Sequence, residues 1–313
     1  MAEASLNFDV FGLGTLVVDH QMFVDHFPDA NTKNVAHSQR IQVGGPVVTA
    51  LTTLAALGNR SYFVGRWNPA SYGSLIEADF ESSGIRYRPC AVDADSKTGV
   101  AHVWVDRSNG DRTIVVTRGT EIAVSDIDWD VLSQSRALHL DGWPMDAALS
   151  AAEQMRVNGR PVFLDTGSPK AGYDRLIPNV DVLICPEATA AKYYDESDGI
   201  LAARKFLECG PLVVAVTSGA SGAVIYTQTD RFQIEAYRVE VVDSNGAGDV
   251  FAGAFIHETL QRLRVNDPVS ALRTLDWQAI GQFAAAVAAI KCQSKGNRTL
   301  PTLEQTNAFI TNR

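Results

Sequence analysis

The chain has 313 residues, of which 46% are hydrophobic and 20% charged, so it can bury the core of one large α/β domain or two modest ones. Its formal charge of −9 argues against nucleic acids and anionic membranes as general partners, because those surfaces attract Lys and Arg. The N-terminus has no basic segment followed by a long apolar run, and no apolar run reaches the roughly 18 residues of a membrane span. We therefore expect a soluble cytoplasmic protein.

The first predicted elements are a strand, a turn and a helix. FDVFGLG reads as a short apolar strand that enters a tight turn, but Val17 occupies the position of the third glycine of a dinucleotide fingerprint, so we reject that motif. Residues 46–58, PVVTALTTLAALG, have apolar side chains at i, i+4 and i+7 and a proline in the first turn. This pattern predicts a core-facing helix introduced by Gly44 and Gly45.

A change of pattern predicts a small separate sheet. Between about residues 97 and 118, TGVAHVWVD and RTIVV alternate around RSNGDR, whose Asn109-Gly110 pair favours a tight hairpin turn. The segment NVAHSQRIQV is a further strand of this sheet. Beyond about residue 137 strands and helices alternate, which predicts a mostly parallel sheet with helices on both faces. Ligands of that architecture bind beyond the carboxyl ends of the strands, where LDG, LDTG, CPE and TSG lie.

The segment VEVVDSNGAGDVFAGAFIHETLQRLR predicts a strand, a loop of small residues and a buried helix. Gly246, Ala247 and Gly248 fall at the helix start, where backbone N–H groups and the helix dipole attract an anion. Asp249 would face the same spot and take a proton from a substrate hydroxyl, while the amides stabilise a transferring phosphoryl group. We expect an ordinary pKa for this carboxyl, because phosphoryl transfer asks mainly for positioning and charge stabilisation. An acidic residue that only complements the helix dipole is the alternative.

DSNGAGDVFAGAF resembles the C-terminal signature of the PfkB, or ribokinase-like, family of carbohydrate kinases, and the resemblance extends over nearly the whole chain. It implies one kinase domain over residues 1–313. The implied fold is a doubly wound, mostly parallel α/β sheet with a small β-sheet lid, formed by about residues 15–43 and 97–118. The implied activity is phosphorylation by ATP, with Mg²⁺ on the nucleotide, of a hydroxymethyl oxygen of a small sugar or sugar derivative. Members commonly form homodimers through the lid.

The resemblance also implies roles for single residues. Asp249 would be the catalytic base, and Gly246 to Gly248 the anion hole. The acceptor sugar would be oriented by Asp19, through two hydroxyl hydrogen bonds, and by Gly44 and Gly45, with Thr49 standing where many members have a sugar-binding Asn. ATP would be bound by Thr217, Gly219 and Gly222 of VAVTSGASGAVIY and by Lys295 and Gly296 of AAIKCQSKGN. A turn aspartate and helix-entry glycines are the alternatives for Asp19, Gly44 and Gly45.

Two groups of polar residues point to further ligands. Lys33, Arg112 and Arg118 lie in or near the predicted lid and would meet a sugar phosphate or sulfonate, although solvated sheet edges are the commoner explanation. Asp243 and Asn245 precede the anion hole, where several relatives bind a monovalent cation such as K⁺ with loop oxygens. Turn formation explains these two residues equally well.

Departures from the family pattern leave alternatives open. Many members organise magnesium-bound water with an N-x-x-E motif, but CPEATAAK offers Pro186 and Thr189 instead. HLDGW, RTIVV and GGP lean toward the ketohexokinase-like and sulfofructose-kinase-like members. A nucleoside kinase of the same family is a second hypothesis. A catalytically weak member with a regulatory or scaffolding role is a third.

Overall fold

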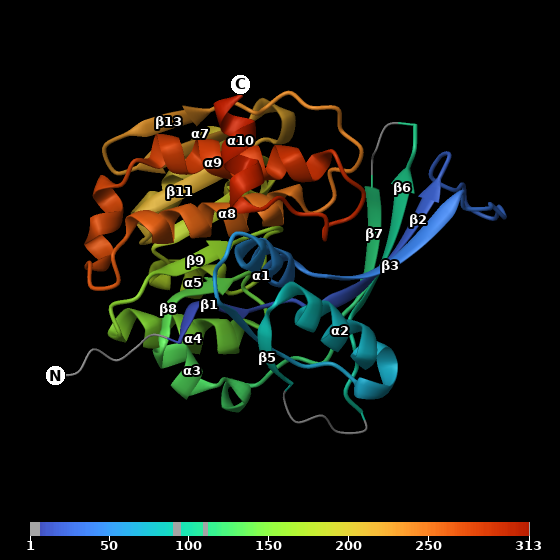
Figure 1. Cartoon of the computed structure of the whole chain (residues 1–313), viewed down its shortest axis with the longest axis horizontal. Helices are drawn as coiled ribbons and strands as arrows, with labels where there is room; N and C mark the ends of the chain where they lie inside the picture. Colours follow the sequence, from blue (N-terminus) through green and yellow to red (C-terminus); the bar gives the residue numbers. More distant parts are fainter. Residues whose placement is uncertain (1–6, 90–94, 109–111, 313) are drawn as a thin grey trace.

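The computed structural model describes residues 7–89, 95–108 and 112–312, which fold into two β-sheets and their covering helices (Figure 1). The predicted Asn109-Gly110 turn lies outside these residues. The larger sheet has the strand order β13–β12–β11–β10–β9–β8–β1–β4–β5. Its strands are β1 (Phe8–Leu13), β4 (Ser61–Gly65), β5 (Arg86–Pro89), β8 (Ser135–Leu140), β9 (Val162–Asp165), β10 (Val182–Pro186), β11 (Val213–Thr217), β12 (Ala223–Thr227) and β13 (Arg231–Ile234).

The larger sheet is parallel from β5 to β11, and only β12 and β13 pair in antiparallel fashion. Its central strands are buried on both faces, as near-continuous apolar runs such as FDVFGL require. Val10 of β1 packs into one hydrophobic core and its neighbour Phe11 into the other. The prediction of a mostly parallel, doubly covered sheet is confirmed.

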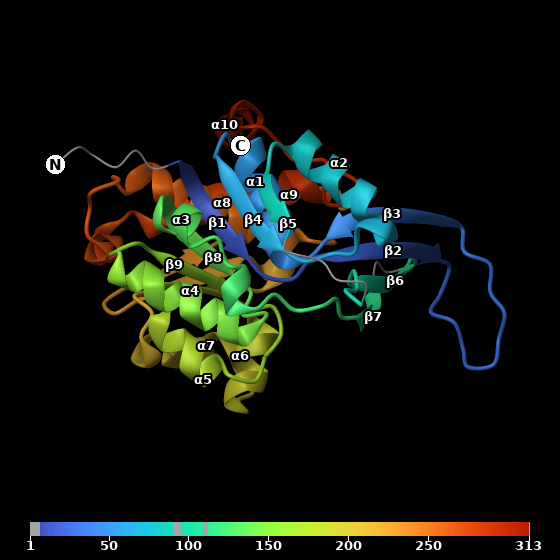
Figure 2. The same ribbon diagram turned by 90° about the horizontal axis from the view of Figure 1, so that it is seen from below.

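The helices divide between the two cores (Figure 2). One face carries α1 (Pro46–Ala56), α2 (Ser74–Ser83), α8 (Ala247–Arg262) and α9 (Trp277–Cys292), with α10 (Leu303–Thr311) packed on α9. The other carries α3 (Trp129–Ser133), α4 (Met145–Val157), α5 (Tyr173–Leu176), α6 (Glu187–Tyr194) and α7 (Gly199–Arg204). Within the described ranges, none of the helices combines the length and the hydropathy that crossing a bilayer requires.

The smaller sheet projects from the body and has the order β3–β2–β6–β7 (Figures 1 and 2). Its strands are β2 (Val17–Val24), β3 (Ser38–Gly44), β6 (Val100–Asp106) and β7 (Arg112–Thr117). Strand β2 follows β1 closely, and β3 leads directly into α1. At that junction Gly45 has φ +106°, and a Cβ there would lie 2.2 Å from the carbonyl oxygen of Thr15. The sheet is therefore fixed at its base by backbone packing that requires glycine.

Helix α8 approaches α1 through Gly253. A Cβ on Gly253 would lie 2.5 Å from the carbonyl oxygen of Ala50 and 2.9 Å from Cβ of Thr53. Helix backbones come this close only where one partner has no side chain. This contact sets the position of α8, and with it the loop at the start of that helix.

We predict that Gly253→Ala lowers the free energy of unfolding by about 1 to 3 kcal/mol, because the added methyl group forces α1 and α8 apart. Gly248→Ala is the matched control on the same helix, since a Cβ at Gly248 meets no atom within 4 Å. It should be neutral or stabilising by about 0.5 to 1 kcal/mol. Urea unfolding of both variants measures the difference, and wild-type stability of Gly253→Ala would contradict the close packing.

Candidate active site

The loop before α8 forms a tight turn around Gly246, which has φ +73° and precedes the first helical residue. A Cβ on Gly246 would lie 3.2 Å from Cβ of Asn297 and 3.5 Å from Cγ2 of Thr49. The N–H of Ala247 donates to the carbonyl of Ser244 at 3.2 Å. The amides of the next helical residues lack a partner within the helix, as in every first turn, so they are available to an anion.

Asp19 on β2 lies against the other predicted acceptor residues. Its side chain is 8% exposed, and a Cβ on Gly44 would lie 2.4 Å from its carboxylate, so only glycine fits beside it. Burial raises the pKa of Asp19 to about 6, against the opposing effects of Gln42, its cross-strand neighbour, and of the charge of Arg298. The structure brings Asp19 and Gly44 together, as the sequence predicted, and places Gly45 next along the chain.

Two buried aspartates that we did not predict as site residues lie at the carboxyl ends of strands β8 and β9: Asp141 follows β8, and Asp165 is the last residue of β9. Asp141 accepts hydrogen bonds from the backbone N–H groups of Thr15 and Trp143, both at 3.0 Å. Asp165 accepts one from Gly167 at 3.1 Å. The sequence carried a signal for both, because LDG and LDTG stand at the carboxyl ends of predicted strands. Burial raises the pKa of Asp165 to about 6, and the charge of Asp141 adds to the effect.

Asp249 stands in the first turn of α8 and has a perturbed carboxyl. Burial raises its pKa well above the ordinary value, and the negative charges of Asp165, Asp19 and Asp141 raise it further, while Arg112 opposes them. The expectation of an ordinary pKa was therefore wrong, because the neighbouring carboxylates come from distant parts of the sequence. A raised pKa makes a carboxylate a stronger proton acceptor once it is ionised, which suits a general base.

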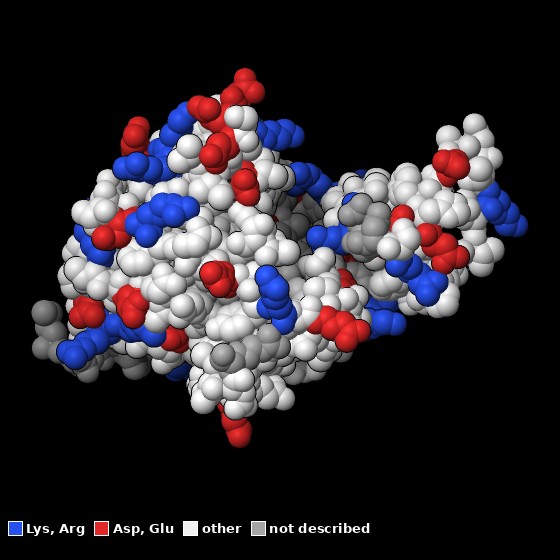
Figure 3. All heavy atoms as spheres, turned by 90° about the horizontal axis from the view of Figure 1, so that it is seen from above, with Lys and Arg blue, Asp and Glu red and all other residues white. Residues whose placement is uncertain are grey.

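The predicted cationic residues separate in the structure. Arg112 reaches from β7 to the turn before α8, where its guanidinium donates to Oδ1 of Asn245 at 2.6 Å. Lys33 is exposed in the long connection between β2 and β3, which extends away from the body (Figure 2). Lys33 is thus not brought to the anion hole, whereas Arg112 is. A hollow lies between the body and the smaller sheet, with Lys and Arg side chains at its border (Figure 3).

The remaining predicted residues lie on α1, in the segment after α9 and at the end of β11. Thr49 is fully buried on α1, and its hydroxyl accepts a hydrogen bond from Asn297 at 3.2 Å. Lys295 is exposed after α9, while Gly296 donates its N–H to the carboxylate of Asp243 at 2.8 Å. Thr217 is the last residue of β11, and Gly219 (φ +55°) and Gly222 (φ +89°) lie in the turn that follows.

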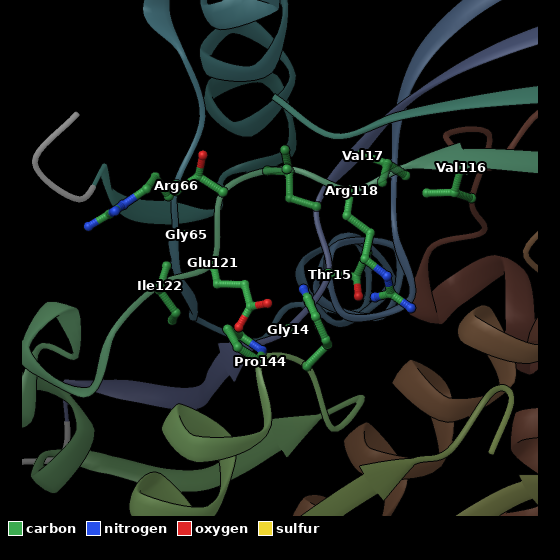
Figure 4. A pocket seen from close by; sticks show the side chains of 14 residues that line it. Gly14, Thr15, Val17, Gly65, Arg66, Val116, Arg118, Glu121, Ile122 and Pro144 are labelled. Carbon is green, nitrogen blue, oxygen red and sulfur yellow. The ribbon is translucent and has the colours of Figure 1, made fainter. Parts of the chain in front are cut away.

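A cavity opens at the base of the smaller sheet (Figure 4). Its wall includes Gly14 to Val17, the segment that leads from β1 to Asp19, together with Val116 and Arg118. The guanidinium of Arg118 lies 4.1 Å from the centre of the Trp143 ring, which lines the same cavity. Among the described residues, no ion pair engages Arg118. Its charge is therefore available to a ligand.

Comparisons with known proteins cover nearly the full chain. The family described as pfkB family carbohydrate kinase matches residues 8–304. An ATP-dependent ribose-1-phosphate kinase of Halopiger xanaduensis is 25% identical over 97% of this chain and 98% of its own. A nucleoside kinase of Methanothermobacter thermautotrophicus is 27% identical over 93% and 91%. The crystal structure of a ribokinase from Thermotoga maritima superposes with a TM-score of 0.81 and 26% identity, covering 97% of this chain and 100% of that one.

The raised pKa of Asp19 predicts a pH-dependent cost to folding. The unfolded chain loses this proton near 3.8 and the folded chain near about 6, so stability falls as pH rises between these values and the full cost is present above them. Asp19→Asn removes the charge. Its free energy of unfolding relative to the wild type should increase by roughly 2 to 3 kcal/mol from about pH 4 to about pH 7.5.

Urea unfolding at the two pH values measures this increase. Asp29→Asn, a change in the exposed connection between β2 and β3, is the control and should show no such increase. An equal effect of Asp19→Asn at both pH values would mean that water solvates the Asp19 carboxylate.

Proposed function

The chain belongs to the pfkB family of carbohydrate kinases, and we propose that it transfers the γ-phosphoryl group of ATP to a hydroxymethyl oxygen of a small sugar or sugar derivative. One observation carries this proposal. Asp249, with a raised pKa, stands beside the open amides of the turn at Gly246 to Gly248 and within the electrostatic reach of Asp19. A proton acceptor, an anion-binding turn and a carboxylate suited to sugar hydroxyls therefore share one site.

The reaction assigns a role to each of these groups. Asp19 accepts hydrogen bonds from acceptor hydroxyls and orients the reacting one, beside Gly44 and Gly45. The oxygen of that hydroxyl attacks the γ-phosphorus, and Asp249 accepts the hydroxyl proton. The bond from the γ-phosphorus to the ADP oxygen breaks. The amides at the start of α8 stabilise the charge on the phosphoryl oxygens.

ATP would enter together with Mg²⁺. The described residues contain no group of three or more His, Cys, Asp or Glu arranged to hold a metal ion by themselves. Magnesium would accordingly be carried as MgATP, where it neutralises phosphate charge. We assign the nucleotide to the turn of Thr217, Gly219 and Gly222 and to the loop of Lys295 and Gly296, in line with the family motifs.

The smaller sheet would act as the lid of a single kinase domain in a cytoplasmic protein. Its face opposite Asp19 exposes Ile41 and Val115, which are 46% and 56% exposed. Apolar side chains on an open sheet favour a partner surface. This supports the homodimer through the lid, which stays a prediction.

Asp249→Asn should lower turnover by roughly 10² to 10⁴ and leave ATP binding intact, since an amide keeps the shape of the side chain but takes no proton. Release of ADP measures turnover, and a fluorescent ATP analogue measures binding. Glu258→Gln, on the same helix and paired with Arg262, is the control and should retain turnover. Wild-type turnover in Asp249→Asn would remove the assignment of the base.

For the acceptor, we propose a sugar that carries an anionic group held by Arg118. The guanidinium of Arg118, which forms no ion pair with another described residue, lines the cavity beside the Asp19 segment and supports this, as does similarity to a ribose-1-phosphate kinase. The finer lean toward ketohexokinase-like or sulfofructose-kinase-like members has no support from the relatives reported above. The nucleoside kinase relative keeps nucleosides as the second candidate class.

An acceptor panel of free sugars, sugar phosphates, sulfonated sugars and nucleosides tests this choice. Arg118→Met should lower kcat/KM for anionic acceptors by about 10-fold to 100-fold, the value of one charge-assisted hydrogen bond, and change that for neutral acceptors little. Arg204→Met, an exposed change on α7, is the control. Equal losses for neutral and anionic acceptors would mean that Arg118 only packs against Trp143. ATP binding without ADP release for any acceptor would favour the regulatory hypothesis.

A further inference from the structure

Lys291, in the last turn of α9, is fully buried although it is a lysine. Its exposed fraction is 0%, and its ammonium donates a hydrogen bond to the backbone carbonyl of Asp243 at 2.8 Å. Lysine is almost never buried without a partner, because removing the ammonium from water is costly. The position therefore indicates that its charge serves the residues around it.

Those residues form the loop that leads into the anion hole. The N–H groups of Val242 and Asp243 donate to the carbonyl of Cys292 at 2.8 and 3.1 Å, which ties the loop to the end of α9. The carboxylate of Asp243 accepts the N–H groups of Asn245 and Gly296, both at 2.8 Å. The carbonyl that Lys291 reaches thus belongs to the residue that holds the loop in shape.

The charges around Lys291 connect it to the site. Lys291 interacts electrostatically with Asp243 and with Asp249, and it is close enough to Arg112 to be affected by that charge. Arg112 approaches the loop from the lid side through Asn245, whereas Lys291 approaches from within the body. The loop that leads into the anion-binding turn is therefore contacted by two cations, Arg112 from the lid and Lys291, which is enclosed by protein, from the body.

We propose that Lys291 is a positioning residue that supplies an internal positive charge behind the anion hole, so that phosphoryl transfer here requires no monovalent cation. This inference rests on the proposed kinase function. A potassium ion and an ammonium group carry the same charge, and both bind carbonyl oxygen. The carbonyl oxygen of Asp243 already has its ammonium, and a second cation beside it would be repelled.

The wild-type protein provides the first test. With choline as the only monovalent cation, turnover should change less than about twofold when KCl replaces choline chloride at constant ionic strength. The unfolding temperature should not respond to KCl beyond its response to choline chloride. Activation by K⁺ of about tenfold or more, or stabilisation specific to K⁺, would overturn the proposal.

Lys291→Met removes the charge and keeps most of the length of the side chain. In choline, turnover should fall by about 10-fold to 100-fold, as for loss of one group that stabilises the transferring phosphoryl. K⁺ or ammonium should restore part of it and should raise the unfolding temperature of this variant alone. Lys192→Met, an exposed change on α6, is the control. Wild-type turnover of Lys291→Met in choline, or a loss that neither cation reverses in turnover or unfolding, would refute the role.

If Lys291→Met does not fold, the K⁺ dependence of Lys291→Arg and of the wild type tests the proposal. Arg keeps the positive charge, so turnover should remain independent of K⁺, and dependence on K⁺ would contradict the proposal. The unfolding measurements need no acceptor. They test Lys291 even if the wild type phosphorylates nothing in the panel, an outcome that would count against the kinase function alone.

Discussion

The repulsion among carboxylates at the carboxyl ends of the strands is the constraint on which the rest of this site depends. Asp165 and Asp249 have raised pKa values because burial removes water from the charges and neighbouring carboxylates repel them. Such a cluster is tolerable only beside fixed positive charge. The helix N-terminus at α8, Arg112 and the half-buried Lys170 provide it, and Lys170 opposes the pKa shift of Asp165. The placement of these cations is thus as necessary to the site as the carboxylates.

The same constraint explains why the smaller sheet belongs to the site. Asp19 comes from β2, and Arg112 from β7 bonds to Asn245 in the loop before α8. One of the carboxylates that repel Asp249 and one of the cations that offset this repulsion therefore lie on the projecting sheet, while Asp249 lies on the body. Any displacement of one sheet relative to the other changes both the repulsion on Asp249 and its compensation. Glycine at position 44 is required because the Asp19 carboxylate occupies the space of a Cβ.

The sequence correctly predicted those features that depend only on residues close together along the chain. The strand, small-residue turn and helix around Gly246 to Asp249 form where the pattern placed them, and the parallel sheet follows from alternation of strands and helices. The perturbed pKa of Asp249 was not predictable, because it arises from burial and from the charges of residues 19, 141 and 165, which only the fold brings near. The burial of Lys291 was not predicted for the same reason. A lysine near the end of an apolar helix is usually interpreted as a side chain whose ammonium reaches solvent. Here the loop that contains Asp243 covers Lys291 and keeps its ammonium buried.

Phosphate chemistry and acceptor choice are encoded differently in this chain. The backbone amides proposed to bind the transferring phosphoryl group come from one continuous turn and helix start, so their arrangement is a property of a short sequence and is shared across acceptors. The cavity wall beside Asp19 combines residues near 14, 66, 118 and 143, from four separate segments. A substitution in any of them alters the wall without touching the turn. Relatives with ribose phosphate and nucleoside kinase names at similar identity are the expected result of that separation. Acceptor preference therefore has to be argued from the charge and shape of the wall, where Arg118 has no ion-pair partner within the described part of the chain.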